Sequence, residues 1–431
     1  MAIRVSKRIL RLLVLVVGSL VFFSLTFSNN ESVAAINDYV SAQASNMAQY
    51  VGLQPEVVSS KAAKEEEKQR MEAEKAQEEG KVDEVLDDEA KKLLSYADDA
   101  SHSTVGPKLA NATFVTLVRN HDLHAMLESI KNVEERFNSK FHYPWVFLNN
   151  EEFTKEFKDT ISAAVSGEAE FGLIPEEHWS YPEWIDQKKA AEARKKLEED
   201  GVIYGGLESY RHMCRFESGF FWRHPLMEKY EWYWRVEPDI KLHCDVDYDV
   251  FKWMEDNDKV YGFTISIHEY KVTIETLWDT TLEFLKEYPQ YENKDNMKDF
   301  ISDDGGKTYN LCHFWSNFEV ANMNFWRSDA YRKYFDYLDK NGGFFYERWG
   351  DAPVHSIAAA LFLPRDKIHY FPDIGYYHPP YNNCPLDKAI FEKGKCTCDQ
   401  ENDFTFQGYS CGNKYFEVNN LKKPEGWDQF Q

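Results

Sequence analysis

The feature that most constrains this chain is a run of 16 uncharged, mostly apolar residues near its N-terminus, Leu12–Phe27. Arg11 precedes the run. Because a long basic side chain can extend its charged end to a membrane surface, the apolar span can approach the roughly 20 residues that cross a bilayer. Residues 1–27 hold four basic side chains and no acidic one, a net charge of +4, which favours a cytosolic N-terminus. We therefore predict a cytoplasmic tail over residues 1–11 and a transmembrane signal anchor over residues 12–27, in a single-pass type II orientation.

A cleaved signal peptide is the alternative interpretation of this run. The sequence Ser32-Val33-Ala34-Ala35 leaves a cleavage site open. However, no Ala-x-Ala pattern follows the run immediately, and the run is long for a signal peptide. These points favour an uncleaved anchor, which places everything after Phe27 in the lumen of an organelle or outside the cell.

Residues 28–107 have the composition of a solvated stem. They carry 17 acidic and 8 basic side chains, a net charge of −9. The segment 61–94 is rich in helix formers and in Glu/Lys pairs four residues apart, but it has few apolar residues at core spacing and no sustained heptad. We predict a partly helical stem that ends near Pro107, followed by one large domain over residues 108–431.

A strand–helix–strand pattern opens this domain. Ala112–Val118 and Tyr143–Leu148 are short apolar runs typical of buried strands. Apolar residues at helical spacing follow Asp122, which we expect to cap the intervening helix. This order predicts a βαβ unit with a parallel sheet, and hence an α/β fold. Further expected elements are strands at Trp232–Val236 and Tyr261–Ile267 and helices at Ala190–Glu199, Thr280–Tyr288, Asp329–Lys340 and Val354–Leu363.

The charge balance excludes one class of function. The chain has 50 basic and 73 acidic residues, a formal net charge of −23, of which −18 falls on residues 108–431. Nucleic-acid binding needs a basic surface that neutralises phosphates, so we exclude a nucleic-acid partner. A phosphorylated small molecule remains compatible with the charge, because a bound divalent cation can offset it locally.

The seven cysteines all lie in residues 108–431. In a lumenal or extracellular domain, disulfides are the expected state, and the odd number leaves at least one thiol unpaired. The alternative is a zinc site built from Cys384, Cys396, Cys398 and Cys411. The Cys-x-Cys spacing and the wide gaps between the other cysteines disfavour that alternative.

The strongest candidate site is the end of the predicted strand at Trp232–Val236. The strand runs directly into Glu237 and Asp239, which are separated by one proline. In α/β folds ligands bind at the carboxyl ends of strands, and two carboxylates there can hold Mn²⁺ or Mg²⁺, which would bridge a diphosphate. The alternative is a pair of solvated acids in a turn.

Three further segments carry candidate side chains. Glu319 lies amid aromatic and amide residues, where partial burial would raise the pKa of its carboxyl group. Asp351 lies in a turn before a predicted helix and is either a site residue or a helix N-cap. His378 lies in a stretch of tyrosines and prolines and is either a metal ligand or a structural histidine. Tryptophans near these segments fit a carbohydrate ligand, since sugar rings stack on aromatic faces.

Five motifs occur in order along residues 108–420: TLVRN (Thr116–Asn120), YWRVEPD (Tyr233–Asp239), CHFWSNFE (Cys312–Glu319), RWGDAPVH (Arg348–His355) and GYYHPPY (Gly375–Tyr381). With these motifs the chain resembles the fungal Kre2/Mnt1-type α-1,2-mannosyltransferases of the Golgi, glycosyltransferase family 15. The resemblance implies a GT-A-like glycosyltransferase fold and a retaining transfer of mannose from GDP-mannose, with Mn²⁺ as cofactor. The implied acceptors are mannose-terminated O-linked and N-linked glycans of secreted and cell-wall proteins.

The resemblance also implies a role for each matched residue. Glu237 and His378 would bind Mn²⁺. Glu319 would be either a nucleophile or a stabiliser of an oxocarbenium-like transition state. Retention by double displacement needs such a carboxylate near the sugar C1, whereas front-face transfer uses the leaving phosphate to deprotonate the acceptor, and the sequence leaves both open. The implied substrate-binding residues are Tyr210, Glu269, Asp351 and, toward the nucleotide, Arg119.

Three other functions remain open from the sequence. A mannosylphosphate transferase, or an enzyme that forms another mannosyl linkage, would share the fold. A membrane-anchored mannose-binding lectin would need no GDP site. A glycoside hydrolase would also use paired acids and aromatic residues, but it would cleave mannosides without a nucleotide.

Overall fold

The computed structural model describes residues 108–425, 427 and 428, which all belong to one compact unit. The predicted cytoplasmic tail, signal anchor and stem therefore lie outside the described residues. Within the described part, no helix has the length and apolar content needed to cross a bilayer.

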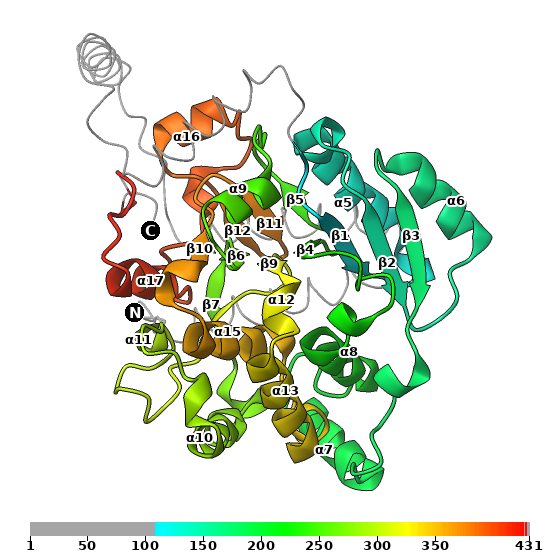
Figure 1. The fold of residues 1–431 in the computed structure, drawn as a ribbon, viewed down its shortest axis with the longest axis vertical. Helices are drawn as coiled ribbons and strands as arrows, with labels where there is room; N and C mark the ends of the chain where they lie inside the picture. Colours follow the sequence, from blue (N-terminus) through cyan, green and yellow to red (C-terminus); the bar gives the residue numbers. More distant parts are fainter. Residues whose placement is uncertain (1–107, 426, 429–431) are drawn as a thin grey trace, which may run out of the picture. The chain divides into compact units, whose positions relative to one another are not determined.

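A seven-stranded mixed sheet forms the centre of the fold, in the order β10-β6-β9-β4-β1-β2-β3 (Figure 1). β1 pairs in parallel with both β2 and β4, and β2 pairs in parallel with β3, so the predicted βαβ unit is confirmed and its strands are parallel, although the sheet as a whole is mixed. β9 is antiparallel to β4 and β6. The strands are β1 (Ala112–Leu117), β2 (Trp145–Asn149), β3 (Ala169–Leu173), β4 (Trp232–Arg235), β6 (Tyr261–Phe263), β9 (Val320–Asn322) and β10 (Ile368–Tyr370).

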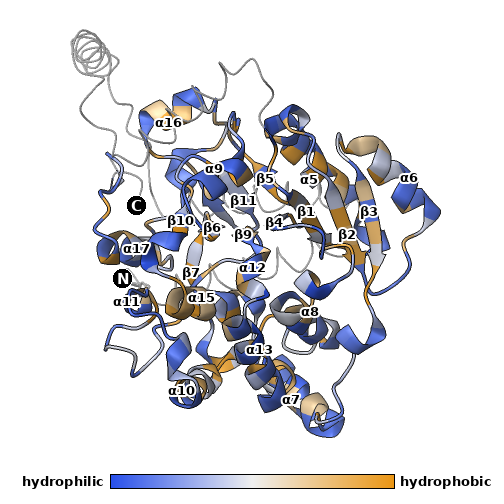
Figure 2. Ribbon diagram, in the orientation of Figure 1, coloured by the Kyte–Doolittle hydropathy of each residue, from blue (hydrophilic) through white to orange (hydrophobic). Residues whose placement is uncertain are grey.

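Alternate residues of the strands enter two separate cores. Phe114 of β1 and Trp145 of β2 pack into one core, whereas their neighbours Val115 and Val146 pack into the other. β1 and β2 are apolar on both faces because both faces are covered, and Figure 2 shows them as largely hydrophobic.

Helices supply the other half of each core. Met126, Ile130 and Val133 of α5 lie in the core of Phe114, while α8, α13 and α15 contribute to the core of Val115. The helices are α5 (Leu123–Arg136), α6 (Lys155–Ala164), α7 (Gln187–Glu199), α8 (Glu208–Gly219), α9 (Val250–Asp256), α10 (Leu277–Glu287), α11 (Lys298–Ile301), α12 (Met323–Trp326), α13 (Asp329–Asn341), α14 (Gly343–Tyr346), α15 (Asp351–Phe362), α16 (Lys388–Lys393) and α17 (Gly412–Val418).

Two short sheets complete the fold. One contains β5 (Lys241–Leu242), β11 (Tyr376–His378) and β12 (Tyr381–Asn383), and the other contains β7 (Ser266–His268) and β8 (Cys312–Phe314). The prediction of one strand over Tyr261–Ile267 is therefore wrong. The chain leaves the main sheet after β6 and enters the β7–β8 pair, and a continuous apolar run cannot reveal such a change of partner.

Asp122 precedes α5 as predicted, but its predicted capping role is wrong. Its side chain makes no capping hydrogen bond, and its backbone (φ −88°, ψ 10°) closes a short 3-10 turn, Asn120–Asp122, that leads into the helix.

The predicted disulfides are confirmed. The structure contains the bonds Cys244–Cys396, Cys312–Cys411 and Cys384–Cys398, and it leaves one buried free thiol, Cys214. The alternative zinc site is wrong, because all four of its cysteines are used in these disulfides.

Candidate functional site

Arg235, the last residue of β4, lies at the centre of the candidate site. Its side chain is buried, and its backbone N–H donates to the carbonyl of Glu319 at 2.9 Å. This contact follows from the antiparallel pairing of β4 with β9, which begins one residue after Glu319. The sheet thus brings two of the predicted motifs together at one edge.

Three carboxylates surround the Arg235 guanidinium. Its Nη1 lies 2.6 Å from Asp351 Oδ2 and 3.9 Å from Glu217 Oε2, and its Nη2 lies 2.5 Å from Glu237 Oε1. Burial lowers the pKa of Arg235, but the carboxylates outweigh burial and raise it overall. A buried cation with several hydrogen-bond donors can hold several acids in fixed orientations.

Glu237 meets His378 on its other side. Glu237 Oε2 lies 3.3 Å from His378 Nε2, and both side chains are partly exposed. Their segments meet because β5, which follows the Glu237 turn, pairs with β11, which ends at His378. Burial raises the pKa of Glu237, but Arg235 and His378 outweigh burial and hold it at about 2. A partly exposed carboxylate oxygen and imidazole nitrogen that face each other fit a Mn²⁺ ion.

Asp239, the second acid of the predicted pair, lies apart from this contact. It is exposed and adopts a positive φ of 64°, in the turn between β4 and β5. In the structure the partner that faces Glu237 is therefore His378.

Glu319 is buried and held by three donors. Its Oε2 accepts from the Tyr233 hydroxyl at 2.9 Å, and its Oε1 accepts from the Tyr261 hydroxyl and from His355 Nδ1, each at 2.8 Å. Only 1% of the Glu319 side chain is exposed. Burial lowers the pKa of His355, but Glu319 outweighs burial and raises it, so this carboxylate favours the protonated imidazole.

Asp351 is the first residue of α15, so the interpretation of it as the N-cap is wrong. The N-cap is Gly350, and the Asp351 carboxylate accepts from Arg235 and from the Ser316 hydroxyl, the latter at 2.7 Å. The acid still benefits from the positive end of the helix dipole, because it lies in the first turn. Asp351 therefore joins the Arg235 cluster.

Tyr210 and Glu269 both contact Arg348. The Arg348 Cζ lies 5.2 Å from the centre of the Tyr210 ring, and Arg348 Nη2 lies 3.6 Å from Glu269 Oε1. Burial and Cys214 raise the pKa of Tyr210, and Asp351 and Glu269 raise it further, so this group adjoins the Arg235 cluster. The structure thus brings these two predicted residues together through a buried arginine.

Arg119 lies two residues beyond β1, and its side chain is exposed. Since β1 and β4 are parallel neighbours, Arg119 and Glu237 follow the same edge of the sheet. The structure places Arg119 at the edge of the site, separate from the buried cluster.

Sequence reasoning missed five side chains that organise this site. The available signal was a charged residue inside an otherwise apolar strand, since Arg235 ends the run WYWR. A buried charge requires a partner, so that pattern already indicates an ion cluster at the strand end. The residues missed are Arg235, Glu217, Tyr233, Tyr261 and His355.

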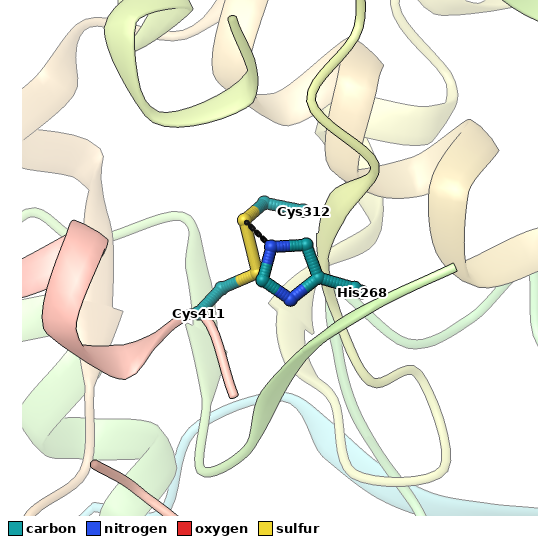
Figure 3. A group of neighbouring side chains, drawn as sticks. All are labelled: His268, Cys312 and Cys411. Carbon is teal, nitrogen blue, oxygen red and sulfur yellow. Dashed lines mark hydrogen bonds between the residues drawn. A yellow bond between two sulfur atoms is a disulfide. The ribbon is translucent and has the colours of Figure 1, made fainter. Parts of the chain in front are cut away.

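A second group of candidate metal ligands is occupied by a disulfide. Ligand atoms of His268, Cys312 and Cys411 lie within 4.8 Å of one another. Figure 3 shows the two sulfur atoms bonded to each other, with the His268 ring against them. Thiolates are the form that binds metal, so the bonded pair is not a metal site.

The family described as glycolipid 2-alpha-mannosyltransferase matches residues 58–420. The glycolipid 2-alpha-mannosyltransferase of Saccharomyces cerevisiae is 54% identical over 453 residues and covers 100% of both chains. The glycolipid 2-alpha-mannosyltransferase 2 of Candida albicans is 65% identical over 331 residues, which are 77% of this chain and 72% of that protein.

Two solved structures are similar to this fold. Core-mannan synthase A of Aspergillus fumigatus, in its Mn/GDP form, has a TM-score of 0.69 and 39% identity, covering 80% of this chain and 92% of that chain. The mannosyltransferase Ktr4p of S. cerevisiae in complex with GDP has a TM-score of 0.67 and 36% identity, covering 80% and 95%. The fold is thus a mixed α/β glycosyltransferase fold.

Glu217 generates a prediction about pH. Burial raises the pKa of its carboxyl group from 4.5 to about 7, although Arg235 opposes this effect. Between pH 4.5 and pH 7 the Glu217 carboxyl group keeps its proton in the folded protein but has lost it in the unfolded chain. The free energy of unfolding therefore decreases as the pH rises from about 4.5 to about 7. Glu217→Gln removes the titration. We expect the free energy of unfolding of Glu217→Gln, measured by urea denaturation, to rise relative to that of wild type as the pH increases from about 4.5 to about 7.

The matched control is Glu283→Gln, which changes an exposed glutamate of α10. Its stability should follow the wild type at every pH. If the Glu217→Gln profile also runs parallel to wild type, the buried carboxyl does not titrate in this window.

Proposed function

Because the chain belongs to the glycolipid 2-alpha-mannosyltransferase family, we propose that it is a retaining α-1,2-mannosyltransferase. It moves mannose from GDP-mannose to mannose-terminated acceptors on O-linked and N-linked glycans of secreted and cell-wall proteins. The observation that carries this proposal is the meeting of the Glu237 carboxylate and the His378 imidazole at the carboxyl end of β4. This edge of the sheet is where α/β folds bind ligands.

Glu237 and His378 would hold Mn²⁺, as supported by the Mn/GDP form of the Aspergillus relative. One oxygen and one nitrogen ligand leave coordination positions for diphosphate oxygens and water. The ion would neutralise charge on the diphosphate. Arg235 fixes Glu237 through the other carboxylate oxygen, so the ligand oxygen keeps its orientation without a second metal-binding acid. Arg119, exposed at the same edge, would contact GDP.

Asp351, Glu269 and Tyr210 would bind sugar hydroxyls. Asp351 is fixed by Arg235 and Ser316, and Glu269 is fixed by Arg348. Carboxylates held by buried cations keep their orientation when a sugar binds, which reduces the ordering cost of binding. This arrangement suits a donor mannose with several hydroxyl groups.

Glu319 would act through its charge. Both of its oxygens already accept hydrogen bonds, and its side chain is 1% exposed, so a direct attack on the sugar C1 would require loss of those bonds. Its carboxylate can instead stabilise positive charge that develops on the mannose ring. In the front-face reaction, the bond from C1 to the GDP phosphate breaks and a bond from C1 to the acceptor oxygen forms. The acceptor proton passes to the leaving phosphate.

The transfer assay tests this function directly. The full-length protein in detergent, with GDP-mannose, Mn²⁺ and methyl-α-mannoside, should release GDP and form an α-1,2-linked disaccharide. Glu237→Ala and His378→Ala should each lose the Mn²⁺-dependent part of GDP binding, by at least about tenfold in affinity, because each removes one metal ligand. Calorimetric titration of GDP with and without Mn²⁺ measures this loss.

Asp239→Asn is the matched control, since Asp239 is exposed two residues from Glu237 and asparagine tolerates its positive φ. Its Mn²⁺-dependent affinity should equal that of wild type. Unchanged affinity in Glu237→Ala would remove Glu237 from the metal site. A mannosylphosphate product, cleavage of mannosides without nucleotide, or mannose binding without GDP would each contradict the proposed transfer reaction.

Glu319→Gln keeps the shape of the side chain and removes its charge. We expect kcat to fall by roughly a hundred- to a thousandfold, the range seen when one stabilising electrostatic group is lost. We also expect mass spectrometry of wild-type protein quenched during turnover to show no mannosyl adduct. Detection of a mannose covalently bound to Glu319 would establish double displacement instead.

We further propose that the domain is a GT-A-like lumenal domain, anchored in the Golgi membrane by residues 12–27 in type II orientation. The apolar run and the four basic residues that precede it support this topology. Alkaline carbonate extraction should leave the full-length protein in the membrane pellet and release a chain that starts at residue 108. Release of both forms would contradict the anchor.

A further inference from the structure

Tyr270 and Tyr409 lie side by side on the surface next to the candidate site. Their ring centroids are 6.4 Å apart, with planes inclined by 40°. They are two of the three exposed tyrosines in the described part of the chain, with exposed fractions of 51% and 38%. Neighbouring exposed tyrosine rings offer apolar faces and hydroxyl groups to a ligand, so this pair is a candidate binding surface.

The backbone around the two tyrosines is firmly held. The carbonyl of Tyr409 accepts from the backbone N–H of His268 at 3.3 Å and lies 3.0 Å from its ring Nδ1. The disulfide Cys312–Cys411 ties the segment of Tyr409 to β8, which pairs with β7 (Figure 3). Tyr270 follows β7 by two residues. The pair is therefore preorganised, which lowers the entropy cost of binding a ligand.

This surface is continuous with the candidate site on the Glu269 side. Glu269 is adjacent to Tyr270 in the chain, and its Oε1 accepts from the Tyr270 backbone N–H at 2.7 Å. A polar carboxylate thus lies at the edge of the aromatic pair.

Aromatic rings also surround His378, the proposed metal ligand. Trp315 lies 4.9 Å from His378 and 5.7 Å from Tyr381, measured between ring centroids.

We propose that Tyr270 and Tyr409 form an additional acceptor subsite, which binds the mannose residue next to the one that receives the transferred sugar. This inference rests on the proposed function. A pyranose presents an apolar C–H face that covers an aromatic ring, while its hydroxyls reach the tyrosine hydroxyls. The adjacent acid and the phenol groups suit a neutral polyhydroxyl ligand. The occupant is thus the second sugar of a mannoside chain.

The test compares methyl-α-mannoside with α-1,2-mannobiose as acceptors of the full-length protein. The mannobiose reaches the subsite and the monosaccharide does not. In the double variant Tyr270→Ala, Tyr409→Ala, the ratio of kcat/KM for mannobiose over methyl-α-mannoside should fall by about three- to tenfold, the range expected for loss of one or two aromatic contacts. Tyr270→Phe, Tyr409→Phe keeps both rings and should retain at least half of the wild-type ratio.

Trp184→Ala is the matched control, because Trp184 is also an exposed aromatic, 50% accessible, but its indole N–H donates to the backbone carbonyl of Asp339 in α13 and not to the segments of Tyr270 and Tyr409. Its acceptor ratio should equal that of wild type. Calorimetric titration of mannobiose in the presence of Mn²⁺ and GDP gives a second readout that does not need turnover, and the alanine double variant should bind more weakly.

An unchanged ratio together with unchanged mannobiose affinity in the alanine variant would overturn the subsite, whether or not the wild type transfers mannose. If wild type binds mannobiose through these tyrosines but forms no product from GDP-mannose, the subsite stands and the proposed transfer function fails. Equal losses on both acceptors would also overturn the subsite, because they would indicate a general disturbance of the site.

Discussion

The buried guanidinium of Arg235 is the interaction on which the rest of the site depends. It holds Glu237, Asp351 and Glu217 at the end of one strand, and these acids come from three separate elements. Loss of one partner from a buried ion pair typically costs about 3–5 kcal/mol, since the remaining charge is left uncompensated. The cluster therefore links the stability of β4, α8 and α15 to the orientation of the side chains that would bind metal and sugar.

The antiparallel direction of β9 brings a second acid, Glu319, to the end of β4. Because β9 runs antiparallel to β4, the residue before β9 lies beside the last residue of β4, and Glu319 meets Arg235 through its backbone. The side chain of Glu319 enters the core of Val115, where Tyr233, Tyr261 and His355 satisfy it. The acids that contact Arg235 from α8 and α15 lie on this same side of the sheet.

The sequence allowed prediction of those features that depend on local pattern. The apolar runs around α5 gave the βαβ unit, and the acid after a buried strand gave Glu237. Local pattern could not predict the features that depend on pairing between segments far apart in the chain. The break between β6 and β7 is set by β8, about 50 residues later, and the partners of Arg235 lie on helices whose docking no local pattern encodes. Six paired cysteines allow 15 connectivities, so their pairing also required the fold.

The local charge explains why an acidic protein would need a metal ion to bind a diphosphate. Four acids, Glu217, Glu237, Glu319 and Asp351, lie in or beside the buried cluster, and Arg235 is the fixed cation among them. A raised pKa keeps Glu217 largely neutral below about pH 7, but the remaining acids still outnumber this cation, even with the charge that Glu319 favours on His355. A diphosphate brought to this edge would meet excess negative charge in a poorly solvated setting, where repulsion is strong. A divalent cation on Glu237 and His378 would reverse that balance at Glu237, the one of these four carboxylates that is partly open to solvent.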